Sequence, residues 1–324
     1  MASGSALGLE PETTGRSTTM SRWIGPAVGT VGLAFVGWTV WREREEVWSV
    51  LPGTEPIWLL TALALAFCAM TGIAAAWRLA LREMGVAPGL GITLRWYFLG
   101  ELGKYVPGGI WAVVGRAELA ARMGLERWAA YGSVLLSLAA TYLAGALVAS
   151  ALVLLGGSTG LSSAQGGLLV GLTLTVVALL HPRIIGWSLS QVERVMGRTL
   201  GLPIPSWSSG IRMIAANIPS WLAIGGATWC VARSLGFALP FSELLAAASI
   251  AWLVGFLVVP APGGLGVREA TFTLLLSSVA GGVAATIALL ARAVFIVADA
   301  LGAAVFLRMG RDGDSRPVTE ERLW

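Results

Sequence analysis

Apolar residues dominate long stretches of the chain, and most stretches have the length of a membrane-spanning helix. The runs lie at about 23–41, 57–80, 90–114, 128–156, 166–186, 212–235, 243–260, 268–280 and 283–307. A helix needs about 20 apolar residues to cross the hydrocarbon core of a bilayer. The sequence lacks the alternating ten-residue pattern of an outer-membrane β-barrel. The pattern therefore predicts an all-α polytopic membrane protein.

The two ends of the chain are polar, which sets the expected domain organisation. Residues 1–21 are rich in Gly, Ser, Thr and Glu, a composition typical of disorder. Residues 309–324 are polar again and rich in arginine. We expect a disordered cytoplasmic tail at 1–21, a single transmembrane domain at 22–308 and a polar cytoplasmic tail at 309–324.

Two of the apolar runs are interrupted by helix-breaking residues and by charges. The first interruption reads Gly103-Lys104-Tyr105-Val106-Pro107-Gly108-Gly109, and the second Pro260-Ala261-Pro262-Gly263-Gly264-Leu265-Gly266-Val267-Arg268-Glu269. Each is accompanied by an arginine and a glutamate, Arg116 and Glu118 after the first, Arg268 and Glu269 in the second. Such residues are costly at membrane depth. One interruption in each half of the chain is typical of the binding site of a transporter built from repeats.

The arginine distribution predicts the orientation and favours two re-entrant hairpins. Cytoplasmic loops of membrane proteins carry an excess of arginine and lysine. With a cytoplasmic N-terminus, the positive loops fall inside only if 90–114 and 243–280 each enter and leave the membrane on one face. We therefore expect about six full transmembrane helices plus two opposed re-entrant helical hairpins that form an inverted pseudo-repeat. Arg233, on the expected outer side, is the exception.

The hairpin turns suit an anionic ligand. Glycine permits open turn geometry, and proline ends a helix without leaving a donor unpaired. A helix N-terminus at membrane depth favours an anion such as phosphate, and arginine or lysine beside it adds charge-assisted hydrogen bonds. We expect turns at Pro107, Gly108, Gly109, Pro262, Gly263 and Gly264. The expected substrate-binding residues are Lys104, Arg116, Arg268, Glu269 and Arg292.

Three further charges have either a coupling or a structural role: Glu118, Asp299 and Glu101. Arg292 and Asp299 are seven residues apart and share a helix face. They either neutralise each other, with Glu118 or Glu269 as further partners, or Arg292 belongs to the site that binds the substrate. Lys104 is three residues from Glu101, so these two either pair with each other or serve the substrate. The sequence leaves both alternatives open.

Composition narrows the function classes. The chain of 324 residues is 56% hydrophobic and 12% charged, with a single lysine and one histidine. The net charge of +4 belongs to cytoplasmic loops and predicts no nucleic-acid partner. One histidine and two isolated cysteines exclude a histidine-rich metal site and make a Ser-His-Asp triad implausible. We expect no metal, no cofactor and no catalytic residue.

The two interrupted segments resemble a known family. Gly103-Lys104-Tyr105-Val106-Pro107-Gly108 with Gly115-Arg116, and Pro262-Gly263-Gly264-Leu265-Gly266-Val267-Arg268-Glu269, are similar to the signatures of the lysylphosphatidylglycerol synthase transmembrane-region family. That family includes the flippase part of the bacterial multiple peptide resistance factors, and the resemblance covers about 23–308. It implies a lipid transporter in the bacterial cytoplasmic membrane with both termini cytoplasmic. No synthase domain follows residue 324, so we expect this chain not to aminoacylate lipid.

The expected function is translocation of an anionic phospholipid, an aminoacylated phospholipid or a polyprenyl-phosphate-linked lipid between leaflets. A membrane-embedded transferase or hydrolase acting on a lipid phosphate is one alternative, with Glu118 or Glu269 as general base. An accessory subunit of a glycolipid pathway is another. Glycine pairs such as Gly225-Gly226 and Gly281-Gly282 pack helices within one chain or between two, so a homodimer is a further possibility.

Overall fold

A computed structural model of the chain gives helices and no strands in the part that it describes. The described residues are 53–106, 110–122, 124–155, 161–179, 181–197, 199, 203–257, 266–276 and 279–309. The all-α prediction is confirmed for these residues. The apolar run at 23–41, both polar tails and the six turn residues Pro107, Gly108, Gly109, Pro262, Gly263 and Gly264 lie outside them.

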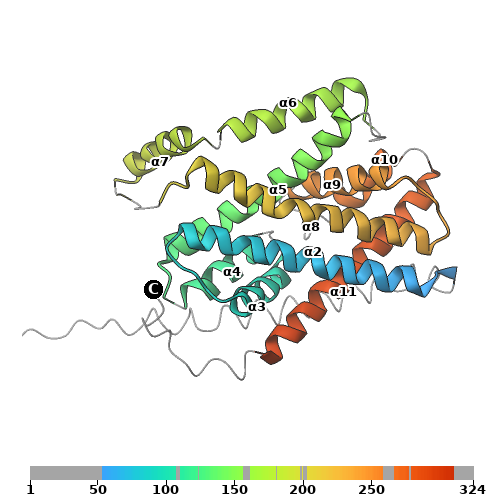
Figure 1. Cartoon of the computed structure of the whole chain (residues 1–324), viewed down its shortest axis with the longest axis horizontal. Coiled ribbons are helices and arrows are strands. Elements are labelled where there is room, and N and C mark those ends of the chain that lie inside the picture. The colour runs from blue at the N-terminus through green and yellow to red at the C-terminus, as the bar shows by residue number, and fades with distance from the viewer. Residues whose placement is uncertain are drawn as a thin grey trace, which may run out of the picture.

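Four long helices form the body of the structure. They are α2 (Pro56–Glu83), α5 (Arg127–Leu154), α8 (Trp207–Ser234) and α11 (Gly281–Met309). Each is long and apolar enough to cross a bilayer. Figure 1 shows α2 and α8 side by side, with α11 crossing them steeply. Helix α2 contacts α8, and α11 contacts both of them. The multi-pass membrane architecture expected from the apolar runs is therefore present, with four candidate spans among the described residues.

Small residues allow these helices to approach closely. Gly72 of α2 faces Ser220 of α8, and Gly145 of α5 faces the indole of Trp221 on α8. A side chain at Gly145 would collide with the rigid ring of Trp221, so that contact requires glycine, whereas one at Gly72 would displace only the Ser220 hydroxyl. Without a hydrophobic driving force in lipid, such close packing is a main source of helix association. Helix α8 continues through Pro219, and the amide of Asn217 donates to the carbonyl of Met213 at 2.8 Å.

The first interrupted run folds as two short helices that lie antiparallel. Helix α3 (Leu90–Glu101) continues into the 3-10 helix η2 (Leu102–Tyr105), and α4 (Trp111–Ala121) returns along them. Gly100 lies against the backbone of Arg116, and Gly103 lies against that of Trp111. At 1.5 Å per residue, each short helix reaches only about 16–18 Å, too little to cross a bilayer. The pair therefore has the antiparallel form that the predicted hairpin requires.

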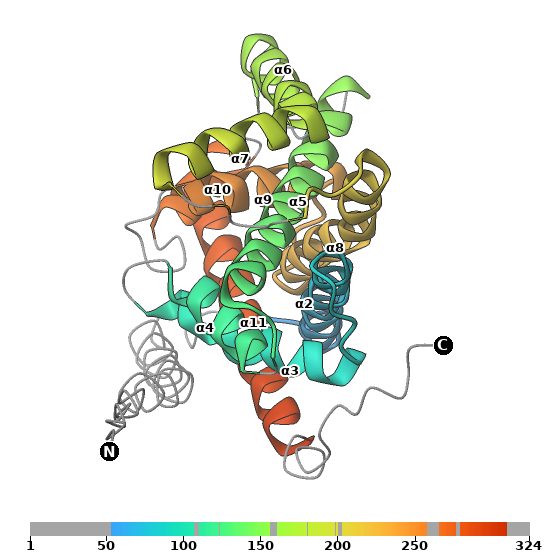
Figure 2. The ribbon, with the colours of Figure 1, turned by 90° about the vertical axis from the view of Figure 1, so that its left-hand side faces the viewer.

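The second interrupted run also forms a pair of helices. Helix α9 (Phe241–Leu257) is followed by α10 (Val267–Leu275), which packs against α9 and α11. Gly266 precedes α10 with φ of 80°, a backbone conformation that favours glycine. Its N–H donates to the Glu269 carboxylate at 2.8 Å. Figure 2 shows α10 beside α9.

One predicted span differs from the structure. The run at 166–186, expected as a single crossing, is divided into α6 (Ser163–Leu179) and α7 (Pro182–Met196), which meet at an angle of 73°. Pro182 begins α7 and the ring nitrogen of His181 accepts from the Arg183 N–H at 3.3 Å, so the break has a local cause. His181 is thus a helix cap.

The α3–α4 contact gives a test of the fold. Replacing Gly100 by alanine would place a Cβ 2.9 Å from the Arg116 backbone nitrogen, so the hairpin must open. We expect a loss of stability of about 1–3 kcal/mol, measured as unfolding of the detergent-solubilised protein. Gly91→Ala in the same helix is the control, because a Cβ there meets nothing within 4 Å. Equal stability of the two variants would contradict the close α3–α4 packing.

Candidate functional site

A buried ion pair joins the first hairpin to the last long helix. The Lys104 Nζ lies 2.6 Å from Asp299 Oδ2, and the Tyr105 hydroxyl donates to the same oxygen at 2.7 Å. Asp299 has no exposed surface, whereas the lysine side chain is 23% exposed. The other carboxylate oxygen, Oδ1, is buried without a hydrogen-bond partner among the described residues. The chain thus holds a carboxylate at the centre of α11 through two groups of η2.

Glu101 extends this pair toward α4. Its Oε2 lies 3.3 Å from the Lys104 Nζ, and its Oε1 lies 3.5 Å from Arg116 Nη2. Arg116 is 1% exposed, and its guanidinium lies within 6 Å of the ring centres of Tyr97 and Trp77. Aromatic faces stabilise a buried cation. The Glu101–Lys104 pair, one of the two alternatives that the sequence left open, is therefore present as part of a larger network that includes Arg116 and Asp299.

A second charged group lies at the start of α10. The Arg292 Nη1 donates to Glu269 Oε1 at 2.6 Å, and Glu269 Oε2 accepts from the Gly266 N–H. The Arg292 Nε is buried without a hydrogen-bond partner among the described residues. Glu269 therefore caps α10 and ties it to α11. Of the alternatives for Arg292 and Asp299, the structure supports partners on other elements rather than a direct bond between them.

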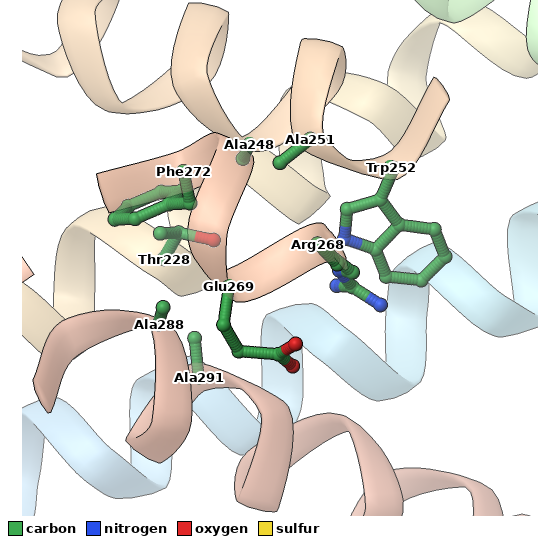
Figure 3. Close-up of a pocket in the computed structure, with 9 residues that line it drawn as sticks. All are labelled: Thr228, Ala248, Ala251, Trp252, Arg268, Glu269, Phe272, Ala288 and Ala291. Carbon is green, nitrogen blue, oxygen red and sulfur yellow. The ribbon is translucent and has the colours of Figure 1, made fainter. Parts of the chain in front are cut away.

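Arg268 is bound differently from the other central cations. Its guanidinium lies 3.6 Å from the ring centre of Trp252 on α9 and 5.8 Å from that of Phe295 on α11. Figure 3 shows Arg268 against the indole and Glu269 directed toward α11. No carboxylate within the described ranges forms an ion pair with Arg268. The aromatic rings thus hold a cation that lacks a carboxylate partner there.

The charges of the two groups do not balance. In the described part of the chain they comprise four cations, Lys104, Arg116, Arg268 and Arg292, and three carboxylates, Glu101, Glu269 and Asp299. One positive charge is in excess, and it corresponds to Arg268. A buried charge without a partner is costly, so an anion at this position would be stabilised.

Two small cavities adjoin the charged residues, and Trp252 lines both of them. One is lined by Arg268, Glu269 and Trp252, among others, and is drawn in Figure 3. The other is lined by Glu101, Arg116 and Trp252, together with Tyr97, Tyr142 and Trp221. Both have space for water but not for a lipid headgroup. In this conformation the centre is closed.

Glu118 lies apart from the network. It is buried on α4 and faces α5, where its oxygens lie 3.5 Å from Arg127 Nη2 and 3.3 Å from the Tyr131 hydroxyl. Its contacts tie α4 to α5. The sequence singled out five cations and carboxylates as substrate-binding, and the structure brings Lys104 and Arg116 into one group and Arg268, Glu269 and Arg292 into the other.

Two central residues were not predicted from the sequence. Tyr105 was not among the expected site residues, but its hydroxyl bonds to Asp299, 194 positions away. Trp252 had no distinguishing signal within the uniformly apolar α9, and only the return of α10 places Arg268 on its ring. A tyrosine next to the only lysine was the one local clue.

These features define a polytopic α-helical membrane protein with a buried, net cationic centre between two helical hairpins. The chain matches the family described as lysylphosphatidylglycerol synthase TM region over residues 22–302, and it belongs to that family. This confirms the resemblance inferred from the two interrupted segments and fits a membrane function related to lipid. A comparison with curated proteins found no match.

The Lys104–Asp299 pair gives a second test. Lys104→Met leaves a carboxylate buried without its cation, so we expect a loss of about 3 kcal/mol of stability. Replacing both residues, as Lys104→Met with Asp299→Leu, removes the unpaired charge and should restore much of the loss. Unfolding in detergent measures these two variants and the single variant Asp299→Leu. If the double variant loses the sum of the two single losses, the residues are not energetically coupled.

Proposed function

We propose that the protein translocates lipids between membrane leaflets and binds a phosphate-bearing headgroup at Arg268. The observation that carries the proposal is the guanidinium of Arg268, which lies on Trp252 without a carboxylate partner among the described residues. Lys104, Arg116 and Arg292 already contact carboxylates. Arg268 is therefore the cation that an anionic headgroup would neutralise, and the other three shape the field around it.

The physical problem of lipid translocation explains why such a centre is useful. A phosphate crossing bare hydrocarbon loses its hydration without compensation, which costs several kcal/mol or more. Arginine offers five donors in a planar fork that matches phosphate oxygens. The two cavities that Trp252 lines would widen one after the other as the headgroup passes. The acyl chains would stay in the bilayer. Anionic phospholipids, aminoacylated phospholipids and polyprenyl-phosphate-linked lipids are the candidate substrates.

The arrangement in the membrane is part of the proposal. We infer that the pair α3–α4 and the pair α9–α10 enter the bilayer from opposite faces as re-entrant hairpins of an inverted repeat. Within the described residues, neither pair contains a helix as long as the four candidate spans, which supports this arrangement. With this arrangement, the arginine-rich loops favour a bacterial inner-membrane protein with both termini on the cytoplasmic side.

The contacts of the glutamates favour a transporter over a lipid-phosphate transferase or hydrolase. Glu269 accepts hydrogen bonds on both carboxylate oxygens, from Arg292 and from the Gly266 N–H. Glu118 lies beside Arg127 and Tyr131, away from both cavities. A general base needs a free oxygen within reach of substrate, and these contacts leave neither glutamate well suited to that role.

Transport can be tested with the purified protein in unilamellar vesicles. Fluorescent phosphatidylglycerol is distributed in both leaflets, and dithionite, which does not cross the membrane, bleaches the outer leaflet. We expect the protein to make the inner pool accessible. Arg268→Gln should slow this rate about tenfold, because each lost charge-assisted bond is worth about 1.5–3 kcal/mol. Lysyl-phosphatidylglycerol and a polyprenyl phosphate, tested in the same way, identify the preferred headgroup.

Arg233→Gln is the matched control. Arg233 also lies over two tryptophan rings, those of Trp58 and Trp229, but at the end of α8 and away from both cavities. We expect its rate to equal that of the unmodified protein. Absence of transport for all three lipids, or equal rates for the Arg268 and Arg233 variants, would contradict the proposal.

A further inference from the structure

Helix α7 differs in character from every spanning helix. It has 15 residues, and arginines and serines are interspersed among its apolar side chains. With 3.6 residues per turn, Arg183, Ser190 and Arg194 fall on one side. The apolar residues Ile184, Ile185, Leu189, Val195 and Met196 fall on the other sides. A short helix with this pattern is amphipathic and lacks the length to span a bilayer.

The apolar face of α7 is only partly covered by the protein. Ile185 and Leu189 are half-buried. Val195 is 88% exposed, and Ile184 and Met196 are also exposed. Trp187, 65% exposed, lies between the arginines and Ile184 around the helix. Figure 1 shows α7 at the edge of the bundle, where it follows α6. Apolar groups from outside the bundle must therefore cover this face.

The neighbouring helix α6 indicates that lipid covers the exposed face of α7. Helix α6 is attached to α5 by a buried bond between the hydroxyls of Ser150 and Thr173 at 3.1 Å. Its outer side exposes Leu168, Leu172 and Leu174, which suits contact with acyl chains. Because α7 follows α6 at 73°, its exposed apolar residues continue the same surface at an angle to the spanning direction.

We propose that α7 is an interfacial helix that lies in the plane of the membrane and binds the anionic surface of one leaflet. Ile184, Val195 and Met196 enter the acyl region to a depth of about 5–10 Å, as is typical of such helices. Trp187 lies at the level of the headgroups, where tryptophan is enriched. Arg183 and Arg194 face the lipid phosphates and give the binding its preference for anionic lipid.

Two positions on opposite sides of α7 give a direct test. Val195 and Ser190 are both exposed in the structure, so a difference between them reports the membrane and not the protein. Single cysteines at these positions are introduced after replacing Cys68 and Cys230 by alanine, and each is spin-labelled in nanodiscs of mixed phosphatidylcholine and phosphatidylglycerol. We expect the Val195→Cys label to be accessible to oxygen and the Ser190→Cys label to a water-soluble nickel complex.

Three other results would overturn the proposal. Two lipid-accessible labels would make α7 the second part of a broken span. Two water-accessible labels would place the helix away from the membrane. Protection of the Val195 label from both reagents, relieved when each nanodisc holds a single copy, would assign the face to a second copy of the chain.

The role of the arginines is tested on the same label. Arg183→Gln with Arg194→Gln should reduce the depth of the Val195 label in nanodiscs with phosphatidylglycerol, and not in phosphatidylcholine alone. Arg82→Gln with Arg122→Gln is the control, because these exposed arginines lie on other helices and the loss of charge is the same. Equal depth in the α7 variant and the control would show that the arginines do not bind the anionic surface. Because neither readout involves transport, failure here is distinguishable from failure of the proposed translocase.

Discussion

The bond between Lys104 and Asp299 is the constraint on which the centre of the structure depends. A carboxylate without exposed surface is tolerated only when it is paired and hydrogen-bonded, and here both groups come from η2, in the middle of a hairpin. The hairpin must therefore stay against α11. Gly100 and Gly115 make this possible, because only a residue without a side chain lets the α3 and α4 backbones approach so closely and bring Glu101 to Arg116.

The surplus cation follows from the same arrangement. Each carboxylate at the centre is shared or committed: Glu101 between Lys104 and Arg116, Asp299 to Lys104 and Tyr105, and Glu269 between Arg292 and the start of α10. Among the described residues no carboxylate pairs with Arg268, and its guanidinium lies on the aromatic face of Trp252 instead. A cation–π contact is worth about 2 kcal/mol when desolvated, less than a buried charge pair with good geometry. An incoming phosphate can therefore compete for Arg268 more readily than for its neighbours.

Local patterns predicted most of the helices, and long-range contacts account for what they missed. Apolar runs of spanning length gave α2, α5, α8 and α11, because helix formation in lipid is set by length and hydropathy. The Glu101–Lys104 pair could be named as one alternative because its residues are about one turn apart. The bond of Tyr105 to Asp299 and the stacking of Arg268 on Trp252 were not, since they depend on how distant helices pack. The bend at His181 was missed because hydropathy continues across it, although Pro182 marked it.

Helix α11 connects the two charged groups mechanically. Arg292 holds the start of α10 through Glu269, and Asp299 holds η2 through Lys104. These two residues are seven positions apart on one helix, about 10 Å along its axis. Each pair of short helices is thus tied to α11 by one ion pair, and the two ion pairs lie at different levels of that helix. If the two hairpins move relative to each other, one must carry α11 with it while the other breaks its pair. Because breaking either pair exposes buried charge, a headgroup bound as we propose would lower the cost of that movement by replacing the lost partner, and this would couple its binding to the opening of one side.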